Sequence, residues 1–235
     1  MGAGPPESAY RAIVIGATGA VGSALVRELL ASPLCAEVTA LVRRPVEMFD
    51  GAPGKAKLRV RVLDMSEVAT IERETADAAQ GCQAAFCTMG VGQPRKLSKD
   101  EVWRVDVQCA DAFASGAKAA GVRHISLLSS TAADLKSRSF YLRLKGAAEA
   151  SVAAAGIART SLFRPSLLVT REIRYGLQDR LTQALFPLVS WMLPGRFHEI
   201  RVEDLARAMR MNAERPGKDG VEILQYPDFA ALLGA

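Results

Sequence analysis

Short apolar runs and helical patterns alternate along most of this chain. Runs rich in β-branched and other apolar residues, typical of buried strands, occupy residues 11–15, 38–42, 58–63, 84–87, 124–128 and 160–163. Apolar residues recur at helical spacing over residues 19–31, 67–79, 99–120 and 139–155. Because strands and helices alternate, we expect an α/β fold, a doubly wound parallel sheet of the Rossmann type with helices on both faces.

The pattern changes in the last quarter of the chain. It predicts a helix interrupted at Pro187, a helix over residues 202–212, a strand over 221–224 and a terminal helix. These elements are too few to fold alone, so we expect a single folding unit. Its expected parts are a leader (1–10), a Rossmann core (11–174) and a small C-terminal cap (175–235) that closes one side of the cleft.

The composition is that of a globular protein. Of 235 residues, 49% are hydrophobic and 23% charged, which excludes a disordered or fibrous chain. The longest apolar stretch, residues 181–193, is interrupted and shorter than the roughly 20 residues that span a bilayer. The leader shows neither the basic region nor the apolar region of a secretory signal. We expect no transmembrane span and a cytoplasmic location.

Cysteine usage and net charge further limit the classes of protein that fit this sequence. The four cysteines show no Cys-x-x-Cys spacing and the chain has only two histidines, so we expect reduced thiols and no metal site. The net charge of +5 comes from basic residues spread along the chain. Nucleic-acid binding is therefore not expected, and a basic protein also suits an anionic cofactor.

A glycine-rich loop follows the first predicted strand. Gly16, Gly19 and Gly22 form a Gly-x-x-Gly-x-x-Gly motif between that strand and the first helix. Glycines at such a turn let backbone N–H groups approach a pyrophosphate at the helix N-terminus. The alternative is a tight turn that merely packs against the sheet. The position of the loop favours a dinucleotide site.

The end of the second strand indicates which dinucleotide. A site for NAD would normally carry Asp or Glu there, whereas this chain carries Arg43 and Arg44. Planar guanidinium groups suit a 2′-phosphate, so we expect NADP(H), although Arg44 could also belong to a solvated loop. Asp64, after the third strand, could accept a hydrogen bond from the adenine amino group or cap the next helix.

The fourth strand ends in Thr88, Met89 and Gly90. Ligands of a doubly wound sheet lie at the carboxyl ends of its strands, so these residues are candidates for cofactor contact. Cys87 directly precedes them. It is expected to be a small buried residue rather than a redox thiol, because no neighbouring cation or resolving cysteine is evident.

Candidate catalytic groups follow the fifth strand. Ser129 and Ser130 end it, and Tyr141 and Lys145 lie one helical turn apart at the start of the next helix. Hydride transfer at a carbonyl carbon needs a proton donor or acceptor at the oxygen, but an ordinary tyrosine titrates near pH 10. A lysine can stabilise the tyrosinate and reach the nicotinamide ribose, and either serine can hold the substrate oxygen.

Six stretches together resemble a known family. They are Gly-Ala-Thr-Gly-Ala-Val-Gly, Val-Thr-Ala-Leu-Val-Arg-Arg, Trp-Arg-Val-Asp, His-Ile-Ser-Leu-Leu-Ser-Ser, Phe-Tyr-Leu-Arg-Leu-Lys-Gly and Leu-Phe-Arg-Pro-Ser-Leu-Leu. The chain resembles the atypical short-chain dehydrogenase/reductases related to the human Tat-interacting protein, over residues 10–230. This resemblance implies contacts with NADPH from Thr18, Gly19, Ala20, Val21, Arg43, Arg44, Tyr141, Lys145, Leu168 and Arg174.

Two functions remain open at this stage. The first is an NADP(H)-dependent oxidoreductase for a small carbonyl or alcohol, with Tyr141 as acid/base. The second is a regulatory protein that binds NADPH and acts through a protein partner with little turnover. The complete Ser/Tyr/Lys set favours the enzyme. The sequence does not indicate the substrate or the oligomeric state.

Three further features have alternative interpretations. His198 could enter a substrate pocket or lie in solvent. The charge of Arg164 could pair with Glu149 or with Glu172. Several apolar residues of the cap could pack internally, line a substrate site or contact a membrane surface; these are Phe186, Trp191 and Met192.

Overall fold

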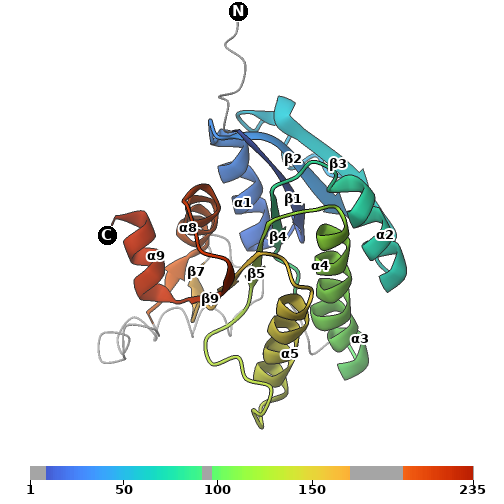
Figure 1. Ribbon diagram of the computed structural model, residues 1–235, viewed down its shortest axis with the longest axis vertical. Coiled ribbons are helices and arrows are strands. Elements are labelled where there is room, and N and C mark those ends of the chain that lie inside the picture. Colours follow the sequence, from blue (N-terminus) through green and yellow to red (C-terminus); the bar gives the residue numbers. More distant parts are fainter. Residues whose placement is uncertain (1–8, 92–96, 170–197, 235) are drawn as a thin grey trace, which may run out of the picture.

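A parallel sheet forms the centre of the computed structural model, which describes residues 9–91, 97–169 and 198–234 (Figure 1). In these residues seven strands pair in the order β3-β2-β1-β4-β5-β6-β9, each parallel to its neighbours. They are β1 (Tyr10–Ile15), β2 (Cys35–Val42), β3 (Leu58–Val62), β4 (Ala84–Cys87), β5 (His124–Leu128), β6 (Arg159–Phe163) and β9 (Gly220–Leu224). The order reverses between β1 and β4, so the predicted doubly wound Rossmann fold is confirmed.

Helices cover both faces of the sheet (Figure 1). One face carries α2 (Val68–Ala78), α4 (Cys109–Ala119) and α5 (Phe140–Ala154), and the other carries α1 (Ala20–Ala31), α8 (Val202–Glu214) and α9 (Tyr226–Leu233). The alternation of side chains along β1 divides the core between these layers. Ile13 and Ile15 pack with Phe113, whereas Val14 packs with Leu25 on the opposite face.

The helix expected over residues 99–120 is not uniform. It consists of α3 (Lys99–Trp103), a π-helical segment η3 (Arg104–Gln108) and α4. A capping box between Ser98 and Glu101 begins it. The π-helical segment buries Asp106, which is 5% exposed. Such segments change the direction of side chains inside a helix and often lie at functional sites.

The described end of the chain extends the sheet. β9 pairs with β6, and α8 packs beside α1, so residues 202–234 belong to the Rossmann layers, although the sequence pattern assigned them to a cap. The ring of Phe229 stacks on that of Phe163 at 5.7 Å. A small second sheet pairs β7 (Leu168–Val169) with β8 (Ile200–Arg201). The other expected cap residues, including Phe186, Trp191 and Met192, lie outside the described residues.

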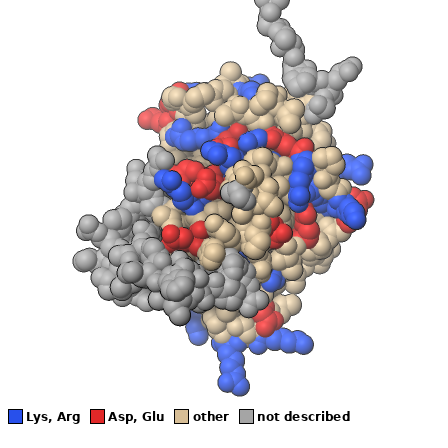
Figure 2. All heavy atoms as spheres, turned by 90° about the vertical axis from the view of Figure 1, so that its left-hand side faces the viewer, with Lys and Arg blue, Asp and Glu red and all other residues tan. Residues whose placement is uncertain are grey.

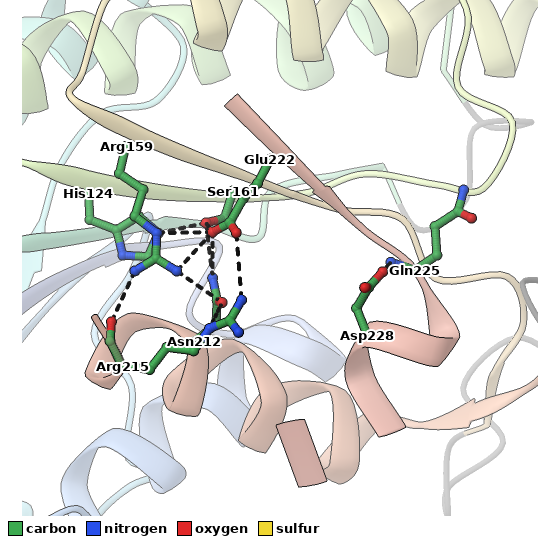
Figure 3. Close-up of polar contacts among 8 residues, drawn as sticks. All are labelled: His124, Arg159, Ser161, Asn212, Arg215, Glu222, Gln225 and Asp228. Atoms are coloured by element: carbon green, nitrogen blue, oxygen red, sulfur yellow. Dashed lines mark hydrogen bonds and ion pairs between the residues drawn. The ribbon is translucent and has the colours of Figure 1, made fainter. Parts of the chain in front are cut away.

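A buried polar network fastens α8 to β5, β6 and β9 (Figure 3). The Ser161 hydroxyl donates to Glu222 Oε1 at 2.5 Å and accepts from Asn212 Nδ2 at 3.0 Å. Arg159 donates to the same carboxylate at 3.0 Å and to Asn212 Oδ1 at 3.0 Å. His124 Nε2 lies 2.7 Å from Ser161 Oγ. The network lies toward the amino ends of the strands, whereas ligands of a doubly wound sheet bind at the carboxyl ends. We therefore assign this network a structural role.

Candidate functional site

The glycine loop packs tightly between β1, α1 and the end of β4. Gly16 has φ of +81°, and a Cβ there would lie 2.6 Å from the carbonyl carbon of Thr88. A Cβ on Gly22 would lie 2.1 Å from the Gly16 oxygen. Packing alone therefore requires glycine at positions 16 and 22.

Gly19 differs from the other two glycines. It is exposed, and its added Cβ would meet the Gly16 oxygen at 3.3 Å with no other atom near. It is also the N-cap of α1 and provides no side chain to occupy the first amides of that helix. The loop therefore presents backbone N–H groups without a side chain above them, which fits the pyrophosphate of a dinucleotide.

The other loop residues implied by the resemblance surround this helix start. Thr18 is exposed and Ala20 is half-buried, whereas the side chain of Val21 is 4% exposed and packs in the core. Val21 can therefore contact a ligand only through its backbone. Leu168, in β7, is half-buried. Arg174 lies outside the described residues.

The segment after β4 lies beside the glycine loop. Thr88 is buried, and both its backbone N–H and its hydroxyl donate to the Ile15 oxygen at 3.0 Å, so its side chain ties β4 to β1. Met89 is half-buried against the core, and Gly90 is exposed. Cys87 is fully buried, and burial raises the pKa of its thiol to about 12. A thiol in this state is unreactive, as the sequence predicted.

The predicted adenine end of the site is open. Arg43 and Arg44 are exposed after β2, and neither forms an ion pair with another described residue. Asp64 is exposed and accepts a hydrogen bond from the Ser66 amide at 2.8 Å. Hydrogen bonds from Ser66 hold the pKa of Asp64 below its usual range. The alternative that Asp64 caps the next helix is wrong, because α2 begins at Val68 with Glu67 as its N-cap.

Tyr141 and Lys145 lie together at the start of α5. The tyrosine is 48% exposed, and the lysine, 8% exposed, has its Nζ 5.9 Å from the centre of the tyrosine ring. One helical turn separates them, so both side chains project from one face, as expected from their spacing. The arrangement joins an accessible phenol to a shielded ammonium group.

A residue that the sequence analysis did not single out completes this pair. Asp106 Oδ1 lies 2.5 Å from Lys145 Nζ, and both side chains are buried. Burial alone would lower the pKa of Lys145, but the charge of Asp106 raises it above its ordinary value. The two residues are 39 positions apart in the chain. Asp106 lies in the π-helical segment, which packs against α5, and periodicity does not reveal such a segment.

The structure distinguishes the two candidate serines. Ser129 is buried, and its hydroxyl donates to Glu149 Oε1 at 2.5 Å. Glu149 in turn pairs with Arg164 at 2.5 Å, which confirms one of the two expected partners of that arginine. Ser130 is half-buried, and its hydroxyl has only a 3.4 Å contact with the Thr131 oxygen. Ser130 is therefore the serine whose hydroxyl is available to a ligand.

Three other expectations concern His198, metal binding and membrane spans. The ring of His198 lies edge-on to that of Tyr226 at 5.0 Å, so it packs against α9. In the part of the chain that the structure describes, no group of three His, Cys, Asp or Glu residues could hold a metal ion. No helix among the described residues is long and apolar enough to cross a membrane.

Comparison with known proteins identifies the family. A family model described as NAD(P)H-binding matches residues 16–184. HTATIP2 of Rattus norvegicus is 33% identical over 218 residues, which cover 90% of this chain and 84% of that protein. The mitochondrial protein fmp52 of Emericella nidulans is 31% identical over 156 residues, 66% of this chain and 65% of that protein.

Solved structures show the same fold. MoeE5 in complex with UDP-glucose and NAD superposes with a TM-score of 0.68 at 22% identity, over 95% of this chain and 82% of that one. A short-chain dehydrogenase/reductase superfamily protein from Agrobacterium tumefaciens, with bound NAD, gives a TM-score of 0.65 at 19% identity, over 96% of this chain and 81% of that one. At these identities the likeness concerns the fold alone.

Proposed function

The chain belongs to the NAD(P)H-binding family and is related to HTATIP2, and we propose that it is an NADP(H)-dependent oxidoreductase acting on a small carbonyl or alcohol. The observation that carries this proposal is the pairing of an exposed Tyr141 with a buried, charged Lys145. A protein that only bound the dinucleotide would have no need for an acid/base phenol at this place.

The residues that would hold the cofactor lie along one edge of the sheet. The backbone of the glycine loop, from Gly16 to Gly22, would bind the pyrophosphate, and Arg43 and Arg44 would bind the 2′-phosphate. Asp64 is exposed on the same side and could contact the adenine. The free guanidinium groups favour NADP(H) over NAD(H).

The cofactor, when bound, supplies or accepts a hydride. The protein must then manage one proton and one oxygen atom of the substrate. Tyr141 would donate the proton to a carbonyl oxygen or take it from an alcohol, and the Lys145 ammonium would stabilise the phenolate. Ser130 would hold the substrate oxygen with its hydroxyl, because that of Ser129 is already bound to Glu149.

The Tyr141→Phe variant tests this function because it removes one hydroxyl and keeps the ring. An NADPH-oxidation screen over aldehydes, ketones and quinones first identifies a substrate. In Tyr141→Phe, kcat should then fall by about 10² or more with little change in NADPH affinity. Lys145→Ala should reduce both, because its ammonium is expected to contact the ribose as well.

Tyr10→Phe is the matched control. It also removes a phenol hydroxyl, but at the amino end of β1, where Tyr10 contacts Glu214. Its kcat should equal that of the wild type. If Tyr141→Phe keeps the wild-type rate, the proposed proton donor is wrong. If the wild type binds NADPH tightly but turns over no carbonyl compound or alcohol, the regulatory hypothesis replaces the enzyme.

A further inference from the structure

A cavity lies at the edge of the sheet opposite the glycine loop. It has a volume of about 310 Å³ and is lined in part by the first residues of four neighbouring strands, Tyr10 of β1, Ala84 of β4, His124 of β5 and Arg159 of β6. The glycine loop, Thr88 and Ser130 follow the other ends of β1, β4 and β5. Because parallel strands place their amino ends at one edge of a sheet and their carboxyl ends at the other, this cavity is separate from the candidate cofactor site.

Two of the charged side chains that line the cavity are already paired. Arg159 donates to Asn212 at 3.0 Å and forms an ion pair with Glu222 at 2.8 Å, as Figure 3 shows. Glu214 forms an ion pair with Arg210. The charges of Arg159 and Glu214 are therefore compensated within the protein.

Arg123 also lines the cavity and differs from these two residues. It is exposed directly before β5, and its guanidinium forms no hydrogen bond or ion pair with any residue in the described ranges 9–91, 97–169 and 198–234. A free guanidinium offers a planar set of donors that matches a carboxylate. Its single uncompensated charge fits a monoanion better than it fits a phosphate dianion.

His124 provides a second unused group, the ring nitrogen Nδ1. The Ser161 hydroxyl donates to Glu222 and accepts from Asn212. Its remaining lone pair must therefore accept from His124 Nε2, which lies 2.7 Å away. The ring is neutral, because burial lowers the pKa of His124 to about 3. In such a ring Nδ1 is an acceptor, and among the described residues it has no partner.

Much of the remaining wall is apolar. Leu34, Ala84 and Ala213 contribute aliphatic side chains, and Tyr10 contributes an aromatic ring. The side-chain amide of Gln83 also lines the cavity, but backbone groups of the protein already occupy its oxygen and its nitrogen. A dry cavity of roughly 150 Å³ holds benzene. The larger volume of this cavity therefore accommodates one ring that carries two substituents.

We propose that this cavity is a second ligand site, which binds a small apolar monocarboxylate that carries a hydroxyl group. Arg123 binds the carboxylate, and the hydroxyl donates to Nδ1 of His124. The apolar wall packs against the carbon skeleton, whose burial favours binding. The proposal is independent of the proposed function, since the cavity shares no residue with the candidate cofactor site.

The test uses 4-hydroxybenzoate as the probe, a single ring with a carboxylate and a hydroxyl group. Benzoate lacks the hydroxyl, and 4-hydroxybenzyl alcohol lacks the charge. Calorimetry at pH 7.5 measures the affinities. The nitrogen resonances of the histidine rings locate the probe by NMR, because the chain has only two histidines and His198→Gln assigns them.

The probe should shift the Nδ1 resonance of His124 and leave that of His198 unchanged. Benzoate should bind about threefold more weakly, the effect of one lost neutral hydrogen bond, and 4-hydroxybenzyl alcohol about tenfold more weakly. Arg123→Gln should weaken binding of the probe by about tenfold or more, because it removes the charged donor. The matched control is Arg11→Gln, which changes an exposed arginine of β1 outside the cavity lining and should leave the affinity unchanged.

Three results would overturn the proposal. An unmoved His124 resonance with the probe at millimolar concentration would show that the cavity takes no such ligand, even if the resonance of His198 moved. Wild-type affinity in Arg123→Gln would show that the guanidinium does not bind the carboxylate. Equal affinities for benzoate and 4-hydroxybenzoate would show that Nδ1 accepts no hydrogen bond from the ligand.

Discussion

Acidification should destabilise this protein through the protonation of His124. The imidazole is 8% exposed at the amino end of β5 and contacts Ser161. Because the Ser161 hydroxyl donates to Glu222 and already accepts from Asn212, His124 must donate through Nε2. Burial, and then the positive charge of Arg159, lowers the pKa of His124 from 6.5 to about 3.

The sign and size of the effect follow from proton linkage. The unfolded chain binds the proton more tightly than the folded one, so the stabilising contribution is complete above pH 6.5 and is lost as the pH falls toward the folded pKa. A shift from 6.5 to about 3 corresponds to about 5 kcal/mol in full. Of this, about 2 kcal/mol should already be lost at pH 5.

Urea unfolding at pH 7.5 and pH 5, followed by circular dichroism, measures this loss directly. At pH 5 the carboxylate of Glu222, whose pKa is lowered by hydrogen bonds from Ser161 and Asn212 despite its burial, is still ionised. His124→Gln keeps a donor for Ser161 but cannot titrate, so its stability should be nearly equal at the two pH values.

His198→Gln is the matched control, because it removes the second of the two histidines from a place outside this network. It should lose stability at pH 5 as the wild type does. The reasoning fails if the wild type is equally stable at both pH values, or if His124→Gln loses as much stability as the wild type.

Two further predictions concern the specificity for the cofactor and the packing of the glycine loop. In calorimetry the wild type should bind NADPH at least tenfold more tightly than NADH, a difference of about 1.4 kcal/mol in binding free energy. The Arg43→Ala, Arg44→Ala double variant should lose this preference, whereas the control Arg73→Ala on α2 should keep it. Equal affinities of the wild type for the two nucleotides would refute the assignment to NADP. Gly22→Ala should destabilise the fold by about 2 kcal/mol or more in urea unfolding, because its Cβ would lie 2.1 Å from the Gly16 oxygen. Gly51→Ala, whose Cβ would have no atom within 4 Å, should not, and equal stabilities of the two variants would contradict this packing.

Local patterns predicted the core of the fold well. The strand over 84–87 and the strand over 124–128 have the expected bounds, and α1 begins within one residue of its expected start. Parallel strands buried on both faces give continuous apolar runs, and the glycine loop marks the first crossover. These signals lie within a few neighbouring residues, so the sequence shows them directly.

Long-range arrangements could not be predicted in the same way. β9 pairs with β6 although Gly220 follows its partner Arg159 by 61 positions in the chain. The polar network that fixes this pairing uses Glu222 and Asn212, which look like ordinary surface residues in the sequence. The sequence likewise could not distinguish Ser129 from Ser130, because the two serines differ in a long-range contact, that of Ser129 with Glu149.

Three largely shielded cations in the described part of the protein show how its elements are held in position. Lys145, Arg164 and Arg159 each pair with an acid from another element or another turn, namely Asp106, Glu149 and Glu222. A buried ion pair contributes little net stability, since desolvation offsets the attraction, but removing one partner is costly. Such pairs therefore fix positions more than they stabilise the fold. At the amino end of the sheet the Arg159 pair fixes α8. At the carboxyl end the Asp106 pair fixes the lysine on which the proposed chemistry depends, and the Arg164 pair fixes Glu149, which holds Ser129 beside the proposed Ser130.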